Sequence, residues 1–97
     1  MNIELKKYGT TLVFRDRGEE AYKAFLSNFV EPPQTENVLI DFAGVTTFSP
    51  SWGDEFLTPL SKKYKERLLL KKTDNPSVRE TLDILTKVKE LKFNFVD

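Results

Sequence analysis

The chain has 97 residues, of which 39% are hydrophobic and 12% aromatic, enough for one small core and too few for two. It contains no cysteine and no histidine, which excludes disulfides, thiolate and imidazole metal ligands, and the usual general base near neutral pH. Fifteen basic residues balance fifteen acidic ones, so no uniform field attracts nucleic acid or membranes. We therefore expect a single domain over residues 1–97.

The hydropathy pattern gives no sign of a membrane or of secretion. No apolar stretch approaches the roughly 20 residues that a membrane-spanning helix needs. The start, Met1-Asn2-Ile3-Glu4, lacks the basic and apolar regions of a secretory signal. We expect a cytoplasmic protein without a membrane partner.

The first third of the chain predicts a β-hairpin followed by a helix. Ile3 to Lys7 alternates apolar and charged residues, as an edge strand does, and Tyr8-Gly9 can turn the chain into a second strand over Thr10 to Asp16. After a break at Arg17-Gly18, Glu19 to Val30 has apolar residues at helical intervals. These residues are Tyr22, Phe25, Leu26, Phe29 and Val30.

The middle of the chain predicts a buried strand and a second helix. Val38 to Phe42 is almost wholly apolar, which favours a strand covered on both faces. After a turn-rich segment, apolar residues recur at helical spacing from near Pro50. Pro59 lies inside this helix and is expected to kink it.

The last third predicts a strand, a helix and a final strand. Leu68 to Leu70 reads as a short buried strand. Asn75 suits the N-cap of a helix, and Pro76 suits its first position. An apolar stripe follows, and Arg79 and Asp83 are spaced to form an ion pair. The stripe consists of Val78, Leu82, Leu85 and Val88. Leu91 to Phe95 alternates again and predicts an edge strand.

The order β-β-α-β-α-β-α-β predicts an α/β domain with a mixed, mostly parallel sheet of about five strands and three helices. Three right-handed crossovers and one antiparallel hairpin would produce this order. Because the edge strands are one-sided and helices are few, we expect part of one sheet face to stay open or to meet a partner.

Functional groups in open α/β sheets collect where a central strand ends, which directs attention to the residues from Asp41 to Leu57. This segment resembles the STAS superfamily, the fold of the bacterial anti-sigma factor antagonists, in its strand, Asp-containing turn and Ser-rich helix start. It is more similar to a STAS-like domain family of unknown function, in which Pro-Ser, an aromatic residue and an Asp-Glu pair follow such a strand. The resemblance implies a STAS-like domain that regulates another protein and is not an enzyme.

The resemblance also implies a modification site. In the anti-sigma factor antagonists the turn reads Asp-Ser-Ser-Gly, and a histidine-kinase-like ATPase phosphorylates the second Ser, whose position Ser51 occupies. The rest of the motif differs, because Ser49, Pro50 and Trp52 stand in place of its Asp, first Ser and Gly. The implied partner is a serine kinase or anti-sigma-type protein of that ATPase class. The implied contact consists of Ser49, Pro50, Ser51, Trp52, Asp54 and Glu55.

The same residues have a purely structural interpretation, which the local pattern favours. Ser49 as N-cap and Pro50 as the first helical residue make a sound helix start without any chemistry. A phosphate on Ser51 would gain from the helix start but would be repelled by the nearby acids Asp54 and Glu55. Both interpretations stay open at this point.

The aromatic and acidic residues of the segment also have two interpretations. Trp52 and Phe56 can form an exposed patch, but their helical spacing with Leu60 favours a place in the core. Asp54 and Glu55 are adjacent, so their side chains point about 100° apart, and ion pairing or solvation is favoured over acid/base catalysis. No catalytic residues, metal ligands or cofactor are expected.

Basic residues are concentrated in the C-terminal half, which raises the alternative of a nucleic-acid-binding accessory protein. Exposed aromatic residues do not alternate with these lysines as they would in a binder of single strands. Solvated faces are therefore the favoured explanation, with docking to an acidic protein surface as a further alternative. These residues are Lys62, Lys63, Lys65, Arg67, Lys71, Lys72, Lys87, Lys89 and Lys92.

Overall fold

The computed structural model describes residues 1–28 and 30–97. Its strands are β1 (Asn2–Glu4), β2 (Thr11–Leu12), β3 (Val38–Asp41), β4 (Thr47–Phe48), β5 (Leu68–Lys71) and β6 (Asn94–Val96). Its helices are α1 (Arg15–Ser27), α2 (Pro50–Tyr64) and α3 (Pro76–Val88), with short 3₁₀ turns at Leu5–Tyr8 and Lys65–Arg67. The predicted α/β class with three helices is confirmed.

The main sheet has the strand order β1-β3-β5-β6, and all its neighbouring strands are parallel. A second, two-stranded parallel sheet joins β2 to β4. The connection from β1 to β3 contains β2 and α1, the connection from β3 to β5 contains β4 and α2, and α3 connects β5 to β6. As predicted, the first and the last strand of the chain, β1 and β6, lie at the two edges of the main sheet.

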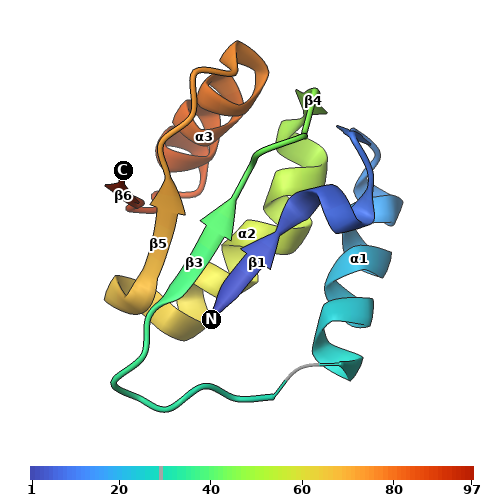
Figure 1. Cartoon of the computed structure of the whole chain (residues 1–97). Helices are drawn as coiled ribbons and strands as arrows, with labels where there is room; N and C mark the ends of the chain where they lie inside the picture. Colours follow the sequence, from blue (N-terminus) through green and yellow to red (C-terminus); the bar gives the residue numbers. More distant parts are fainter. Residues whose placement is uncertain (29) are drawn as a thin grey trace.

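The three helices cover one face of the main sheet, behind the strands in Figure 1. Right-handed crossovers that all step in the same direction place their helices on the same side. On the opposite face Leu39 and Leu69 are only half-buried, whereas Val38 and Ile40 on the helix side are fully buried. The expectation of a partly open sheet face is confirmed, and the expectation that the third strand is covered on both faces is wrong.

The predicted N-terminal hairpin is wrong, because β1 and β2 do not pair with each other. The chain turns into a 3₁₀ helix at Leu5, which interrupts the alternation and places that leucine wholly inside the core. β1 then pairs with β3, and β2 pairs with β4, a short strand in a segment that the sequence predicts as a turn. These pairings join residues 35 or more positions apart, beyond the reach of a local pattern.

Helix α1 begins at Arg15, four residues before the predicted start, and continues through Gly18. A Cβ atom at Gly18 would lie 2.8 Å from the carbonyl oxygen of Trp52, so the glycine permits close packing of α1 on α2. Phe25 is buried, but Val30 is 82% exposed and lies outside the helix, contrary to the prediction. The predicted apolar residue Phe29 lies outside the described residues.

The caps of the two later helices are confirmed. The Asn75 side chain accepts hydrogen bonds from the backbone N–H groups of Ser77 and Val78, and Pro76 is the first residue of α3. Helix α2 runs without interruption past Pro59. Two details of α3 differ from the prediction, since Val88 is 69% exposed, and Asp83 pairs with Lys87 instead of Arg79.

Candidate protein-contact site at the start of the second helix

The helix start predicted as a contact lies at the corner where α1 and α2 begin. The β2–β4 pair places Leu12 beside Phe48, and each strand leads directly into a helix. The two helices then pack along each other. Residues far apart in the sequence, from 13 to 18 and from 49 to 55, therefore share one corner of the molecule.

Ser49 and Pro50 have the structural roles expected of them. The Ser49 hydroxyl accepts a 3.1 Å hydrogen bond from the backbone N–H of Trp52, as an N-cap does, and donates to the backbone carbonyl of Val13. Pro50 is the first residue of α2. The cap thus also ties the start of α2 to the segment that leads into α1.

Ser51 is half-buried at the second position of α2, so it is neither sealed in the core nor fully displayed. Its hydroxyl makes no hydrogen bond to another described residue. Ser51 and Glu55 are one helical turn apart and share a face of α2. The hydroxyl is therefore not committed to a structural role.

Trp52 is in the core, and its predicted place in a partner contact is wrong. Its side chain is 1% exposed and stacks on Phe56, with ring centroids 5.1 Å apart. Tyr8 and Phe48 pack against the same indole ring, at 6.2 and 5.8 Å. The helical spacing of Trp52 and Phe56 favours a core position, and the structure confirms that interpretation.

Asp54 is buried too, so it cannot contact a partner directly. Its carboxylate accepts hydrogen bonds from the Thr58 hydroxyl at 2.7 Å and from Arg15 at 3.0 Å, and Lys89 lies 3.4 Å away. Burial by itself would raise the pKa of Asp54, but the hydrogen bonds from Thr58, Arg15 and Lys89 outweigh burial and lower it. Asp54 therefore links α1, α2 and the end of α3.

Glu55 completes this network from the solvent side. Its carboxylate lies 2.6 Å from the same Arg15 Nη1 atom that binds Asp54. Hydrogen bonds with Asp54 and Glu55 raise the pKa of Arg15. Ion pairing, the interpretation that the sequence favours for the two acids, is confirmed, and the guanidinium occupies the space between their carboxylates.

The network predicts a pH-dependent contribution to stability. Because the folded-state pKa of Asp54 is depressed, its charge stabilises the fold above the unfolded-state pKa of about 3.9, and the gain is lost as the pH falls through the lower folded-state pKa. We expect Asp54→Asn to reduce the free energy of unfolding by about 2 kcal/mol at pH 7. Urea denaturation should show this difference shrinking below about pH 3.9.

Asp74→Asn is a suitable control for this experiment. Asp74 is exposed and makes no side-chain hydrogen bond or ion pair with another described residue. Its replacement should change the stability by less than about 0.5 kcal/mol at pH 7. A difference between Asp54→Asn and wild type that persists undiminished in acid would contradict the assignment.

The sequence pattern did not identify Phe14 as a surface residue. Leu12, Val13 and Phe14 are consecutive apolar residues, and they read as one buried strand. In the structure Leu12 is 1% exposed, but Phe14 is 68% exposed at the N-cap position of α1. The strand ends before Phe14, so its buried face does not extend that far.

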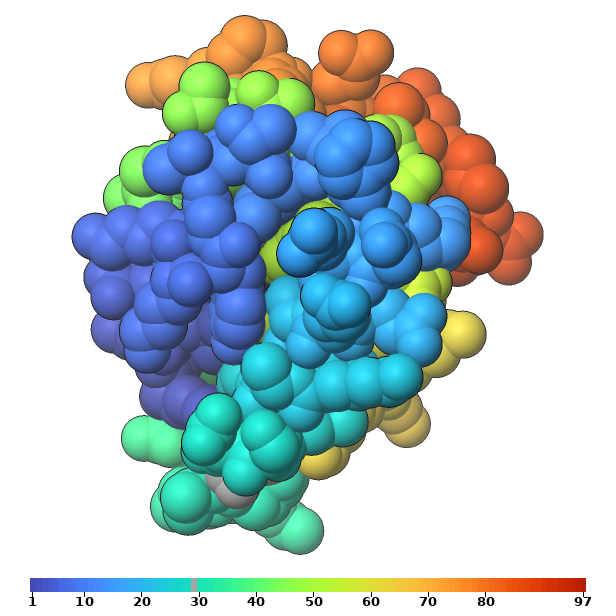
Figure 2. Space-filling model, turned by 90° about the vertical axis from the view of Figure 1, so that its right-hand side faces the viewer, coloured from blue at the N-terminus to red at the C-terminus, as the bar shows by residue number. Residues whose placement is uncertain are grey.

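A hollow of about 450 Å³ lies beside Phe14. Figure 2 shows the narrow gap between the N-terminal segment in dark blue and α1 in light blue, with the yellow-green of α2 at its base. Tyr8, Arg17 and Trp52 contribute to its walls, and burial raises the pKa of Tyr8. The corner thus combines an exposed aromatic ring with a concave surface.

Five of the C-terminal lysines lie beside carboxylates of the same chain. This explains them as parts of surface ion pairs and weakens the case for a continuous basic face. The pairs are Lys63–Glu31, Lys71–Asp41, Lys72–Asp97, Lys87–Asp83 and Lys89–Asp54.

Across residues 1–28 and 30–97, no helix is both long and apolar enough to cross a membrane. The same residues contain no group of three or more acidic side chains arranged to hold a metal ion.

The chain matches no protein-family model, no curated protein and no solved structure.

Proposed function

We propose that this protein is a non-enzymatic regulatory module that binds another protein through the α1–α2 corner, defined as Phe14, Arg17, Pro50, Ser51 and Glu55. The observation that carries the proposal is the 68% exposure of Phe14 next to the half-buried helix start of α2. Aromatic residues that are anchored on rigid elements and exposed in the free protein are typical hot spots of protein interfaces. Trp52 and Asp54 support the corner from inside.

The hydrogen bond between Ser49 and Val13 holds the corner together. Phe14 directly follows Val13, and Ser51 lies two residues after Ser49, so the exposed ring and the serine flank the same hydrogen bond. Two packed helices fix both positions, which limits the ordering cost of binding. A partner that covers Phe14 would therefore reach Ser51 as well.

Phosphorylation of Ser51 is the switch that we propose for this contact. A phosphate would add about −1.5 to −2 charges at the start of α2, where the helix dipole favours an anion. The acids Asp54 and Glu55 would repel it less than the sequence indicates, because Arg15 and Lys89 already pair with them. The STAS resemblance implies that the partner is a histidine-kinase-like ATPase.

The proposal predicts that binding depends on the corner and not on exposed apolar residues elsewhere. Phe14→Ala should weaken partner binding at least tenfold, about 1.4 kcal/mol, whereas Val88→Ala should have no effect. Phe14 and Val88 are 68% and 69% exposed, so both variants remove an apolar side chain of similar exposure. Affinity for a partner purified from the native host, measured by calorimetry, checks this.

The second comparison uses Ser51. Ser51→Asp should weaken binding, and the uncharged Ser51→Ala should not, if charge at this position is the switch. Mapping the phosphate by mass spectrometry after incubation with the partner and ATP tests the modification itself. Equal binding by wild type, Phe14→Ala and Ser51→Asp would refute the proposal, and steeply salt-dependent binding of DNA or RNA would favour the basic half instead.

A further inference from the structure

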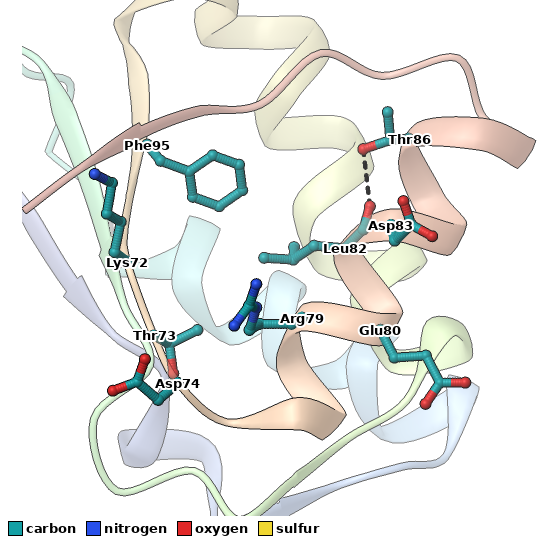
Figure 3. A pocket seen from close by; sticks show the side chains of 9 residues that line it. All are labelled: Lys72, Thr73, Asp74, Arg79, Glu80, Leu82, Asp83, Thr86 and Phe95. Carbon is teal, nitrogen blue, oxygen red and sulfur yellow. Dashed lines mark hydrogen bonds between the residues drawn. The ribbon is translucent and has the colours of Figure 1, made fainter.

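A cavity of about 730 Å³ lies between α3 and the ends of β5 and β6 (Figure 3). Its volume is within the range of sites that bind small organic ligands. Arg79, Leu82 and Thr86 line it from α3, Lys72 and Thr73 from the end of β5, and Phe95 from β6. None of these residues belongs to the α1–α2 corner.

The cavity exists because the helix layer stops short of the last strand. Ile40, Leu70 and Phe95 occupy adjoining register positions that face the helices. Ile40 and Leu70 are wholly buried, whereas Phe95 is 47% exposed. Helix α3 packs on α2 and β4 and does not bury the Phe95 side chain.

Arg79 is the charged group that points into this space. Figure 3 shows its guanidinium in the middle of the view, between Thr73 and Leu82 and below the Phe95 ring. The guanidinium makes no ion pair and no hydrogen bond with another described residue. A guanidinium presents its donors in a planar fork that matches a carboxylate.

The other charges at the cavity do not neutralise Arg79. Asp83 pairs with Lys87 at 2.9 Å, and Lys72 pairs with Asp97 at 3.0 Å. In Figure 3 the carboxylates of Asp74, Glu80 and Asp83 point away from the guanidinium. The space therefore holds the unpaired Arg79 guanidinium beside the apolar side chains of Leu82 and Phe95, and the carboxylates of Asp74, Glu80 and Asp83 also line it.

We propose that this cavity binds an organic carboxylate with a flat apolar body. The carboxylate would bind the Arg79 fork, and the apolar body would lie on the exposed part of the Phe95 side chain and on Leu82. Such a group is found both on a free aryl-alkyl acid and at the end of a polypeptide with a C-terminal aromatic residue. The inference does not depend on the function proposed for the α1–α2 corner.

The test is a titration of the ¹⁵N-labelled full chain with 3-phenylpropionate, followed by NMR. We expect saturable shifts of the Arg79 side-chain N–H and of the Leu82 and Phe95 amides. The neutral 3-phenylpropanol should bind at least tenfold more weakly than the acid, because it lacks the charge. Acetate should also bind at least tenfold more weakly than the acid, because it lacks the ring. A peptide with a free C-terminal phenylalanine distinguishes the two kinds of ligand. If the peptide binds and 3-phenylpropionate does not, the ligand is the end of a polypeptide.

Arg79→Gln should weaken binding of the acid at least tenfold without lowering the melting temperature, because Arg79 is exposed and unpaired. Lys62→Gln, at an exposed cation on α2 outside the α1–α2 corner, is the control and should bind the acid as the wild type does. Three results would overturn the proposal. They are no saturable shift with either the acid or the peptide up to about 10 mM, equal affinity for the acid and the alcohol, and unchanged affinity of Arg79→Gln for the acid.

Discussion

Replacement of Trp52 by alanine should reduce the free energy of unfolding by about 3 to 5 kcal/mol. The indole is 1% exposed and packs against Phe56, Phe48 and Tyr8, so truncation leaves a large cavity at the centre of the core. Domains of this size have about 5 to 15 kcal/mol of stability in total, so the variant is expected to be close to unfolding.

Urea denaturation followed by circular dichroism measures this loss. Tryptophan fluorescence cannot be used, because the variant lacks the only tryptophan of the chain. Val88→Ala, which truncates a residue that is 69% exposed, should change the stability by less than about 0.5 kcal/mol. A loss below about 1 kcal/mol in Trp52→Ala would mean that the indole is not in the core. Because Trp52→Ala is expected to destabilise the fold, reduced partner binding by this variant would not show that Trp52 contacts the partner.

Gly18→Ala is the substitution with the second largest expected effect. In an exposed helix, glycine to alanine stabilises by about 1 kcal/mol. Here the new Cβ atom would lie 2.8 Å from the oxygen and 3.0 Å from the Cα atom of Trp52, both backbone atoms that cannot turn aside. We expect α1 and α2 to be forced apart, at a net cost of about 1 to 3 kcal/mol.

Thermal unfolding tests this prediction, with a fall in melting temperature of roughly 4 to 8 °C per kcal/mol. Gly53→Ala is the matched comparison, because the atoms nearest to its Cβ atom are side-chain atoms of Phe48 and Leu85, at 3.1 and 3.2 Å. Those side chains can shift by a few tenths of an ångström, so the loss should be smaller. A melting temperature raised by Gly18→Ala would contradict the close packing of the two helices.

Local signals in the sequence were enough to predict the later helices. Ser49-Pro50 and Asn75-Pro76 each combine an N-cap with a proline at the first helical position, and both helices begin there. Leu68 to Leu70 likewise became part of strand β5, whereas β6 covers Asn94–Val96 and shares only two residues with the predicted strand from Leu91 to Phe95. For these elements the residues that carry the signal lie within the element or next to it in the sequence.

The errors arose where distant residues decide the structure. In the sequence, Gly18 indicates the end of a strand, but it lies inside α1. A glycine is needed there because the backbone of Trp52 leaves no room for a Cβ atom. The expected hairpin depends on which strands pair, and β1 pairs with β3 instead of β2.

The same limit applied to the candidate site. The sequence located the helix start, and the caps and ion pairs there were expected. Its resemblance to a phosphorylated turn placed Trp52 and Asp54 in a partner contact, although both are buried. Phe14 was missed because exposure at the end of a two-residue strand depends on where the pairing stops.

The most direct test of the α1–α2 corner is photo-crosslinking in the native host with benzoylphenylalanine in place of Phe14. We predict that this probe forms a covalent product with one protein, that Ser51→Asp suppresses the product, and that the same probe in place of Val88 does not form it. Absence of any product from position 14, or the same product from both positions, would contradict a partner contact at this corner.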